Sequence, residues 1–264
     1  MDIYDNEIEI IKMFQDVQSS EVLLLPEDSE ECERVFLSVH DKNKWSRWKD
    51  TSGKADPPPD FYCDEYGLMM DVMRIDDHGH IGKNGKTIVN PTLQRETEVT
   101  RELKEKGVFE TFPNAKPILI VDTGLSTDED HNYSFYRDSF VRTVEAHKRK
   151  ILQYQRNHPS CKTVFFVFDE ASPYFEAKKK TIFRKIGDIE QGYPHLWFRD
   201  QAFIKAVEGS QIDYLIWYTP YKHCTITDAS GKPLELPRAT IMKVKGSIIE
   251  TMEFSADRMM SAEL

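Results

Sequence analysis

Two aspartates separated by a tight turn are the residues of this chain best placed to do chemistry. Asp60 follows three consecutive prolines and opens a short apolar segment, and Asp71 lies eleven positions later within a second apolar segment. Gly67, between the two segments, favours a turn. A hairpin bent at Gly67 would bring both carboxylates to one end of a sheet. Paired carboxylates bind Mg²⁺ or Mn²⁺, and such an ion activates a bound water and neutralises the charge of a phosphate under attack.

This hairpin resembles the motif of the PD-(D/E)XK, or restriction-endonuclease-like, nuclease superfamily. The shared features are a proline-aspartate pair, a turn containing glycine, and an acid within a hydrophobic strand, and the resemblance covers about residues 20–125. It implies a mixed sheet flanked by helices, with Asp60 and Asp71 as catalytic metal ligands. The family has a lysine two positions after the second acid, where this chain has Met73. Arg74, the next residue, points to the opposite face of a strand.

The missing lysine leaves the activity of such a site open. Lys83 or Lys86, in the loop that follows, could supply the cation, and Glu33 is a candidate for a third acidic ligand. Alternatively, Asp60 caps a turn and Asp71 is a buried acid paired with an arginine. A buried carboxylate needs a partner in either case, because an unpaired buried charge is costly.

The negative charge of the chain is concentrated at its N-terminus. The net charge is −10, and residues 1–40 contain eleven acidic and two basic residues, a net charge of −9. The remaining residues therefore carry a net charge of −1. This distribution excludes the first 40 residues as a phosphate-binding surface but leaves the rest of the chain available to nucleic acid.

A basic helix is predicted over residues 132–158. Between Arg137 and Arg156 it holds six basic and two acidic residues, a net charge of +4. Such a helix can bind phosphates, although basic helix faces are often only solvated. The candidates for binding nucleic acid are Arg142, Lys148, Arg149, Lys150 and Arg156.

Two further groups of polar residues follow predicted strands. Asp76, Asp77, His78 and His80 include transition-metal ligands, but their spacing matches no fixed zinc motif, so we interpret them as a solvated loop. The acidic residues at positions 169 and 170 follow an apolar strand, where α/β sheets often present ligand-facing groups.

Short apolar strands alternate with helices along the chain, which predicts an α/β fold. Strands are expected over residues 61–64, 68–75, 117–122, 163–168 and 212–218, and helices over 7–18, 92–107, 132–158 and 201–209, with a further helix beginning near Asp28. We expect a restriction-endonuclease-like mixed sheet flanked by helices. The single domain 1–264 would comprise an acidic helical region (1–40), a nuclease-like core (58–220), and a C-terminal β-hairpin extension with a tail (221–264).

The chain contains four widely spaced cysteines, and it has neither a recognisable signal peptide nor an apolar run of the roughly 18 residues that a membrane span needs. These features predict a soluble, cytoplasmic protein with no membrane partner. The expected function is nucleic-acid binding by a nuclease-like core, extending to Mg²⁺-dependent or Mn²⁺-dependent phosphodiester hydrolysis. The alternative is a catalytically inactive nuclease-like scaffold that binds a protein partner, which Met73 and the acidic N-terminal region favour.

Overall fold

The computed structural model describes residues 7–52, 59–81, 87–89, 91–112, 131–177, 192–222, 226–227, 233–234, 236–247 and 249–262. Lys83, Lys86 and the strand expected over residues 117–122 lie outside these ranges.

A seven-stranded mixed sheet lies at the centre of the protein, with the strand order β1-β13-β10-β7-β4-β3-β2. Its strands are β1 (Val22–Leu25), β2 (Lys49–Asp50), β3 (Phe61–Cys63), β4 (Leu68–Ile75), β7 (Lys162–Asp169), β10 (Tyr214–Tyr218) and β13 (Ala239–Lys243). Strands β4, β7 and β10 are parallel, and they are apolar along most of their length because both faces are buried. The predicted β3–β4 hairpin is present, and Gly67 in its turn has φ +60°, which glycine tolerates best.

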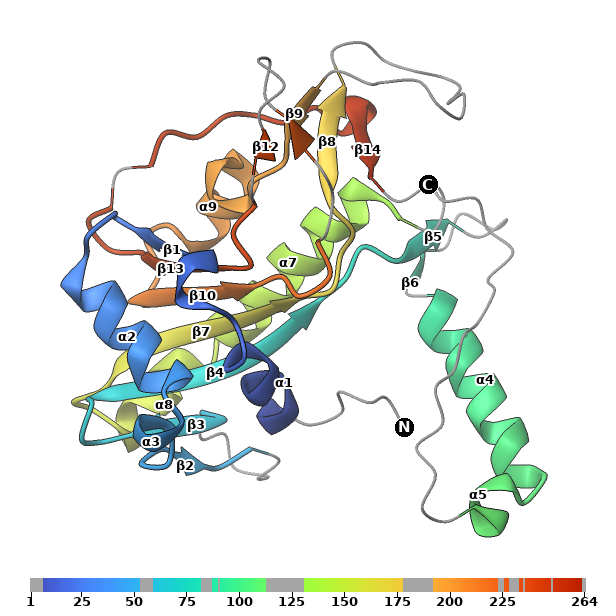
Figure 1. Ribbon diagram of the computed structural model, residues 1–264, viewed down its shortest axis with the longest axis horizontal. Helices are drawn as coiled ribbons and strands as arrows, with labels where there is room; N and C mark the ends of the chain where they lie inside the picture. Colours follow the sequence, from blue (N-terminus) through green and yellow to red (C-terminus); the bar gives the residue numbers. More distant parts are fainter. Residues whose placement is uncertain are drawn as a thin grey trace.

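Helices cover both faces of the sheet, as Figure 1 shows. One layer contains α1 (Glu7–Phe14) and α2 (Glu30–His40), and the other contains α7 (Tyr133–Lys148), α8 (Ile151–Asn157) and α9 (Gln201–Val207). Strand residues alternate between the layers: Met70 and Val72 pack in the core under α1 and α2, whereas Met73 and Ile75 pack in the core under α7 and α9. Asp71 therefore lies on the α7 side of the sheet. The expected α/β class and helix-flanked mixed sheet are confirmed.

The remaining elements are short or peripheral. Helices α4 (Pro91–Glu105) and α5 (Val108–Thr111) extend away from the sheet in Figure 1, and α3 (Lys42–Trp45) follows α2. The smaller sheets are β5 (Gly79–Ile81) with β6 (Thr87–Val89), β11 (Ile226–Thr227) with β12 (Pro233–Leu234), and β8 (Tyr174–Ala177) between β9 (Gly192–Pro194) and β14 (Met259–Ser261). Within the ranges described, no helix has both the length and the apolar character that crossing a membrane requires.

The C-terminal region differs from the predicted β-hairpin extension. Strand β13 lies inside the main sheet, antiparallel to β10 and parallel to β1. Four of its five residues are buried, as expected for a strand in a sheet whose two faces are both covered. The acidic N-terminal region also joins this sheet, because β1 forms its edge.

Several helix boundaries also differ from the prediction; the first helix, for example, ends at Phe14 and not at residue 18. The basic helix is divided into α7 and α8, with Arg149 and Lys150 between them, and the Lys150 amide donates to the His147 carbonyl in a tighter turn (2.9 Å). The second helix is capped by Ser29, whose hydroxyl accepts from the Cys32 amide (3.2 Å), and not by Asp28.

Candidate functional site

The register of the β3–β4 hairpin places Asp60 opposite Asp71. Phe61 pairs with Met70 in antiparallel register, so the residue before Phe61 faces the residue after Met70. The Val72 amide donates to Asp60 Oδ2 at 2.8 Å, and the charge of Asp71 acts on the Asp60 carboxyl group. The structure thus brings together the two acids on which the sequence argument rested.

Two side chains from the helical layer hold Asp71 in place. His147 Nδ1, from the last turn of α7, contacts Asp71 Oδ2, and the Tyr154 hydroxyl of α8 donates to the same oxygen at 3.1 Å. Asp71 is only 3% exposed, whereas the His147 side chain is 21% exposed. The predicted alternative partner, an arginine, is not what the structure shows: Arg74 forms two hydrogen bonds of 2.8 Å with Glu170.

Asp60 retains its proton at neutral pH. Burial first, and then the charge of Asp71, raise the pKa of Asp60 to about 8, while the hydrogen bond from the Val72 amide acts in the opposite direction. The pair therefore carries about one negative charge at neutral pH. A divalent cation would compensate the repulsion that otherwise keeps this proton bound, so these residues suit a hard cation with oxygen ligands.

The structure separates Glu33 from this pair, whereas Lys83 and Lys86 lie outside the described residues. Glu33 is exposed on α2, in the helical layer on the opposite side of the sheet. Met73, at the position of the family lysine, is 3% exposed and packs in the core. Besides Asp71, the acid whose charge raises the pKa of Asp60 is Glu7 of α1. Sequence reasoning missed Glu7, His147 and Tyr154, because no local spacing links them to the hairpin.

The five basic candidates have different surroundings. Arg142, Arg149, Lys150 and Arg156 are exposed, whereas Lys148 Nζ is bound to Glu145 (2.6 Å) and to the Ala206 carbonyl (3.0 Å). The break between α7 and α8 places Arg149 and Lys150 immediately after His147. These two basic side chains are exposed at the start of α8.

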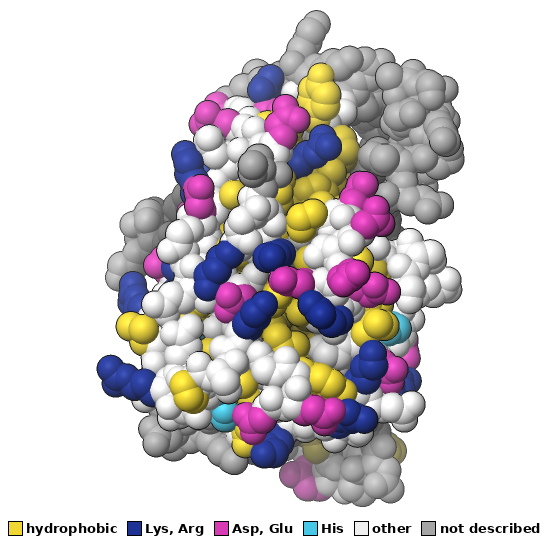
Figure 2. Space-filling model, turned by 90° about the vertical axis from the view of Figure 1, so that its left-hand side faces the viewer, with side chains coloured by type: hydrophobic (Ala, Val, Ile, Leu, Met, Phe, Trp, Pro, Cys, Tyr) yellow, Lys and Arg dark blue, Asp and Glu magenta, His cyan; other side chains and the backbone are white. Residues whose placement is uncertain are grey.

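The side of the molecule shown in Figure 2, where α2 lies, has a different charge pattern. Lys and Arg side chains are interspersed with Asp and Glu side chains across it. Such an arrangement favours surface ion pairs over contact with a phosphate backbone. The α7–α8 junction is a better candidate for nucleic acid.

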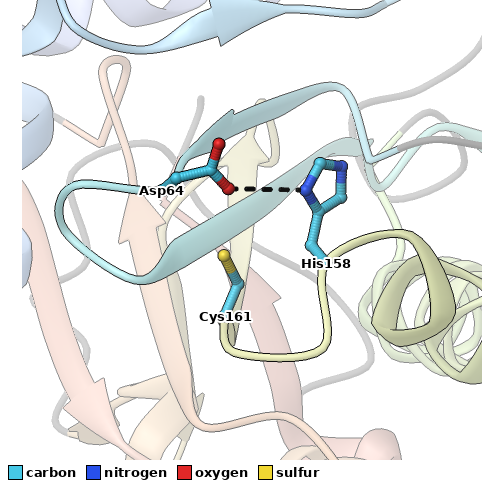
Figure 3. A group of neighbouring side chains, drawn as sticks. All are labelled: Asp64, His158 and Cys161. Carbon is cyan, nitrogen blue, oxygen red and sulfur yellow. Dashed lines mark ion pairs between the residues drawn. The ribbon is translucent and has the colours of Figure 1, made fainter.

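Asp64, His158 and Cys161 form a three-residue group at the end of the hairpin (Figure 3). Asp64 Oδ1 lies 3.7 Å from His158 Nδ1, and the Asp64 side chain is 62% exposed. Burial raises the pKa of the Cys161 thiol, which disfavours the thiolate that a metal needs. We therefore treat this group as a weaker site.

Asp77, His78 and His131 form a second group whose ligand atoms lie within 4.8 Å of one another. The interpretation of residues 76–80 as a solvated loop is wrong for Asp77, which is fully buried. Burial alone would raise the pKa of Asp77, but hydrogen bonds from His131 and Tyr174 lower it to about 2. The described residues therefore contain Asp/His groupings that could hold a metal ion.

Asp169, at the end of β7, faces inward. Its Oδ2 accepts from Tyr136 (2.7 Å) and Trp217 Nε1 (2.8 Å) and lies 2.7 Å from Lys222 Nζ. The carboxylate is fully buried, and the Lys222 side chain is 13% exposed. Asp169 thus stabilises the core and does not present an open ligand site.

Comparisons of the chain with protein-family models, curated proteins and solved structures find no match. The function is therefore inferred from the geometry of the sites.

Proposed function

We propose that this protein binds nucleic acid and hydrolyses a phosphodiester bond with Mg²⁺ or Mn²⁺ held by Asp60 and Asp71. The observation that carries this proposal is the register of the β3–β4 hairpin, which sets Asp60 opposite Asp71, so that the charge of Asp71 raises the pKa of Asp60. The resemblance to the PD-(D/E)XK superfamily supports it, because Asp60 directly precedes β3 and Asp71 lies within β4 of the antiparallel meander β2–β3–β4.

Each residue around the pair has a chemical role in this proposal. The bound ion would lower the pKa of a water and neutralise charge on the phosphate. Asp60 and Asp71 would each offer an oxygen, as is usual for Mg²⁺, which keeps several waters. The Tyr154 hydroxyl fixes the orientation of Asp71, and its own burial raises the Tyr154 pKa, so it remains a donor.

His147 takes the role that the resemblance assigns to the missing lysine. Its Nδ1 is directed at Asp71, so in the neutral imidazole with ionised Asp71 this nitrogen donates and Nε2 is the proton acceptor. His147 is also the most exposed member of the Asp71–His147–Tyr154 cluster. It can therefore receive a proton from water at the protein surface while Asp71 holds the ring.

The experiment that tests this function is a cleavage assay with the full chain. Supercoiled DNA, single-stranded DNA and RNA are each incubated with Mn²⁺, with Mg²⁺ and with EDTA. We expect cleavage of at least one substrate with either metal and none with EDTA. Cleavage that persists in EDTA, or absence of cleavage of all three with both metals, would refute the hydrolytic proposal.

Metal affinity should depend on pH through Asp60. Because the raised pKa of Asp60, about 8, keeps it protonated at lower pH, binding one ion releases one proton there. We expect the apparent Mn²⁺ affinity to rise about tenfold per pH unit from about pH 6 to about pH 8 and then to level off. Calorimetric titration across this range measures it. An affinity that stays constant between pH 6 and pH 8 would contradict the raised pKa of Asp60.

Nucleic-acid binding should depend on the α7–α8 junction. The double substitution Arg149→Ala/Lys150→Ala is expected to weaken DNA binding and to lower the slope of log K against log salt by about two, since each phosphate contact contributes about 0.9. The matched control is Lys12→Ala/Lys42→Ala, which removes two exposed lysines elsewhere. Equal effects of both double substitutions would show that the junction is not the binding surface.

A catalytically inactive interaction scaffold is the second candidate. The burial of Met73 and of Asp71 favours it, because the hairpin strand has no cation at the position of the family lysine and these two side chains offer little open surface. This candidate predicts a protein partner and no cleavage, so the assay with three substrates distinguishes the two.

A further inference from the structure

The second unassigned cluster lies at the end of β4, where the backbone brings distant residues together. Asp77 and His78 directly follow β4, and His131 lies 54 positions beyond Asp77. His78 and His131 form an isolated antiparallel bridge, and the Asn132 amide donates to the Asp77 carbonyl at 3.1 Å. The backbone therefore fixes the relative position of the three side chains without any ion.

We propose that Asp77, His78 and His131 form a transition-metal site of the Zn²⁺ class, distinct from the aspartate pair of the hairpin. Two imidazoles with one carboxylate are the ligands that Zn²⁺ and related ions prefer, whereas Mg²⁺ prefers oxygen alone. Their donor atoms lie within 4.8 Å of one another. Three protein ligands leave the fourth position of a tetrahedral ion open, as in catalytic zinc sites.

The distances within the cluster suit such an ion. His131 Nδ1 lies 3.1 Å from both oxygens of Asp77, so the imidazole is directed between them. A tetrahedral ion with bonds of about 2.0–2.1 Å separates its ligand atoms by about 3.3 Å. The rings of His78 and His131 lie 4.8 Å apart, with an angle of 50° between their planes. An ion could therefore replace the proton between Asp77 and His131 with small side-chain shifts.

The surroundings of Asp77 resemble the outer shell of a metal site. Asp77 Oδ2 accepts from the Ser172 amide (3.1 Å), the Ser172 hydroxyl (2.8 Å) and the Tyr174 hydroxyl (2.6 Å). Hydrogen bonds of this kind orient a ligating carboxylate. The other oxygen, Oδ1, is in contact with His131. Oδ2 is thus held by these three donors, while both oxygens lie 3.1 Å from His131 Nδ1.

A polar cavity adjoins the cluster. Its volume is about 310 Å³, and His131, Ser134, Arg258 and Ser261 are among its lining residues. A small anionic or polar ligand in this cavity would lie beside His131 and beside Arg258, whose guanidinium also pairs with Glu176. The cavity is the feature that separates this cluster from a purely structural hydrogen-bond network.

Cobalt binding tests the proposal directly. The EDTA-treated full chain is titrated with Co²⁺ and, in competition, with Zn²⁺. We expect one strongly bound ion, visible d–d bands of tetrahedral or five-coordinate Co²⁺, and no sulphur-to-cobalt charge-transfer band. His78→Ala and His131→Ala should abolish this binding, and Ser172→Ala should weaken it about tenfold or more.

Matched variants separate this site from the others. His158→Ala and Cys161→Ser remove ligands of the group at the hairpin end, and Asp71→Asn alters the aspartate pair; all three should retain stoichiometric Co²⁺ binding. His78→Gln, at a half-buried position, provides a milder second variant if His131→Ala does not fold. Loss of binding in Cys161→Ser, a thiolate band, unaltered binding in both His78 variants, or no stoichiometric binding by the wild-type chain would overturn the assignment.

Discussion

Asp71→Asn is expected to reduce the rate of Mn²⁺-dependent cleavage by at least about 100-fold, because a catalytic metal stabilises the charge of the transition state by several kcal/mol. The substitution preserves the shape of the side chain but removes the charge that faces both Asp60 and His147. Asp60→Asn should have a similar effect, since each residue supplies one of the two ligands. Initial rates at saturating Mn²⁺, together with Mn²⁺ affinity, measure the loss.

Controls distinguish loss of the site from loss of the fold. Asp16→Asn makes the same chemical change at an exposed position and should leave the rate unaltered. His147→Ala should retain Mn²⁺ binding while slowing cleavage about 10²–10⁴-fold, which is the usual contribution of a general base. If Asp71→Asn folds and cleaves at the wild-type rate, the aspartate pair is not the catalytic site and the activity arises elsewhere.

Asp169→Asn is expected to destabilise the protein by about 3 kcal/mol, the largest stability effect that we predict for a single conservative change. Asp169 is fully buried, and its Oδ2 lies 2.7 Å from Lys222 Nζ. The asparagine cannot compensate the lysine charge. Its NH2 group also cannot accept a hydrogen bond, so the substitution loses either the bond from the Ala171 amide to Oδ1 or the bonds from Tyr136 and Trp217 to Oδ2. Urea unfolding followed by circular dichroism measures the change in the free energy of unfolding.

A double-mutant cycle with Lys222→Met tests the cause. If the unpaired lysine charge accounts for most of the loss, Asp169→Asn/Lys222→Met should be more stable than Asp169→Asn alone. Strictly additive effects of the two substitutions would show that the ion pair contributes nothing and that the hydrogen bonds of Tyr136 and Trp217 account for the result.

The two predicted sites differ in how far the sequence could define them. Asp60 and Asp71 lie on one hairpin, so the turn at Gly67 and the alternation of a strand were sufficient to predict their convergence. His147 and Tyr154 are 76 and 83 positions from Asp71. Whether they reach Asp71 depends on where the α7–α8 break falls, and the basic residues around it gave no indication of the break.

The sequence was also insufficient to predict the position of β13 in the sheet and the contact between Asp77, His78 and His131. The apolar composition of β13 indicated a strand but did not identify the strands beside it. Its position between β10 and β1 depends on pairing with both of these strands. Asp77 and His78 were visible in the sequence as polar residues after a strand. The bridge to His131 completes the candidate metal site. It joins residues that are far apart in the sequence, so no local pattern indicates it.

The sequence by itself determined the α/β class, the hairpin with its two acids, and the concentration of negative charge in the first 40 residues, because turn chemistry, strand periodicity and charge counting act over short distances. Tertiary structure alone decided that Asp71 pairs with a histidine and a tyrosine and that Glu33 lies on the opposite side of the sheet from Asp71. It also decided that Asp169 is buried and stabilises the core. These outcomes depend on which helix packs on which face, and that choice is made by the burial of whole surfaces and not by any local pattern.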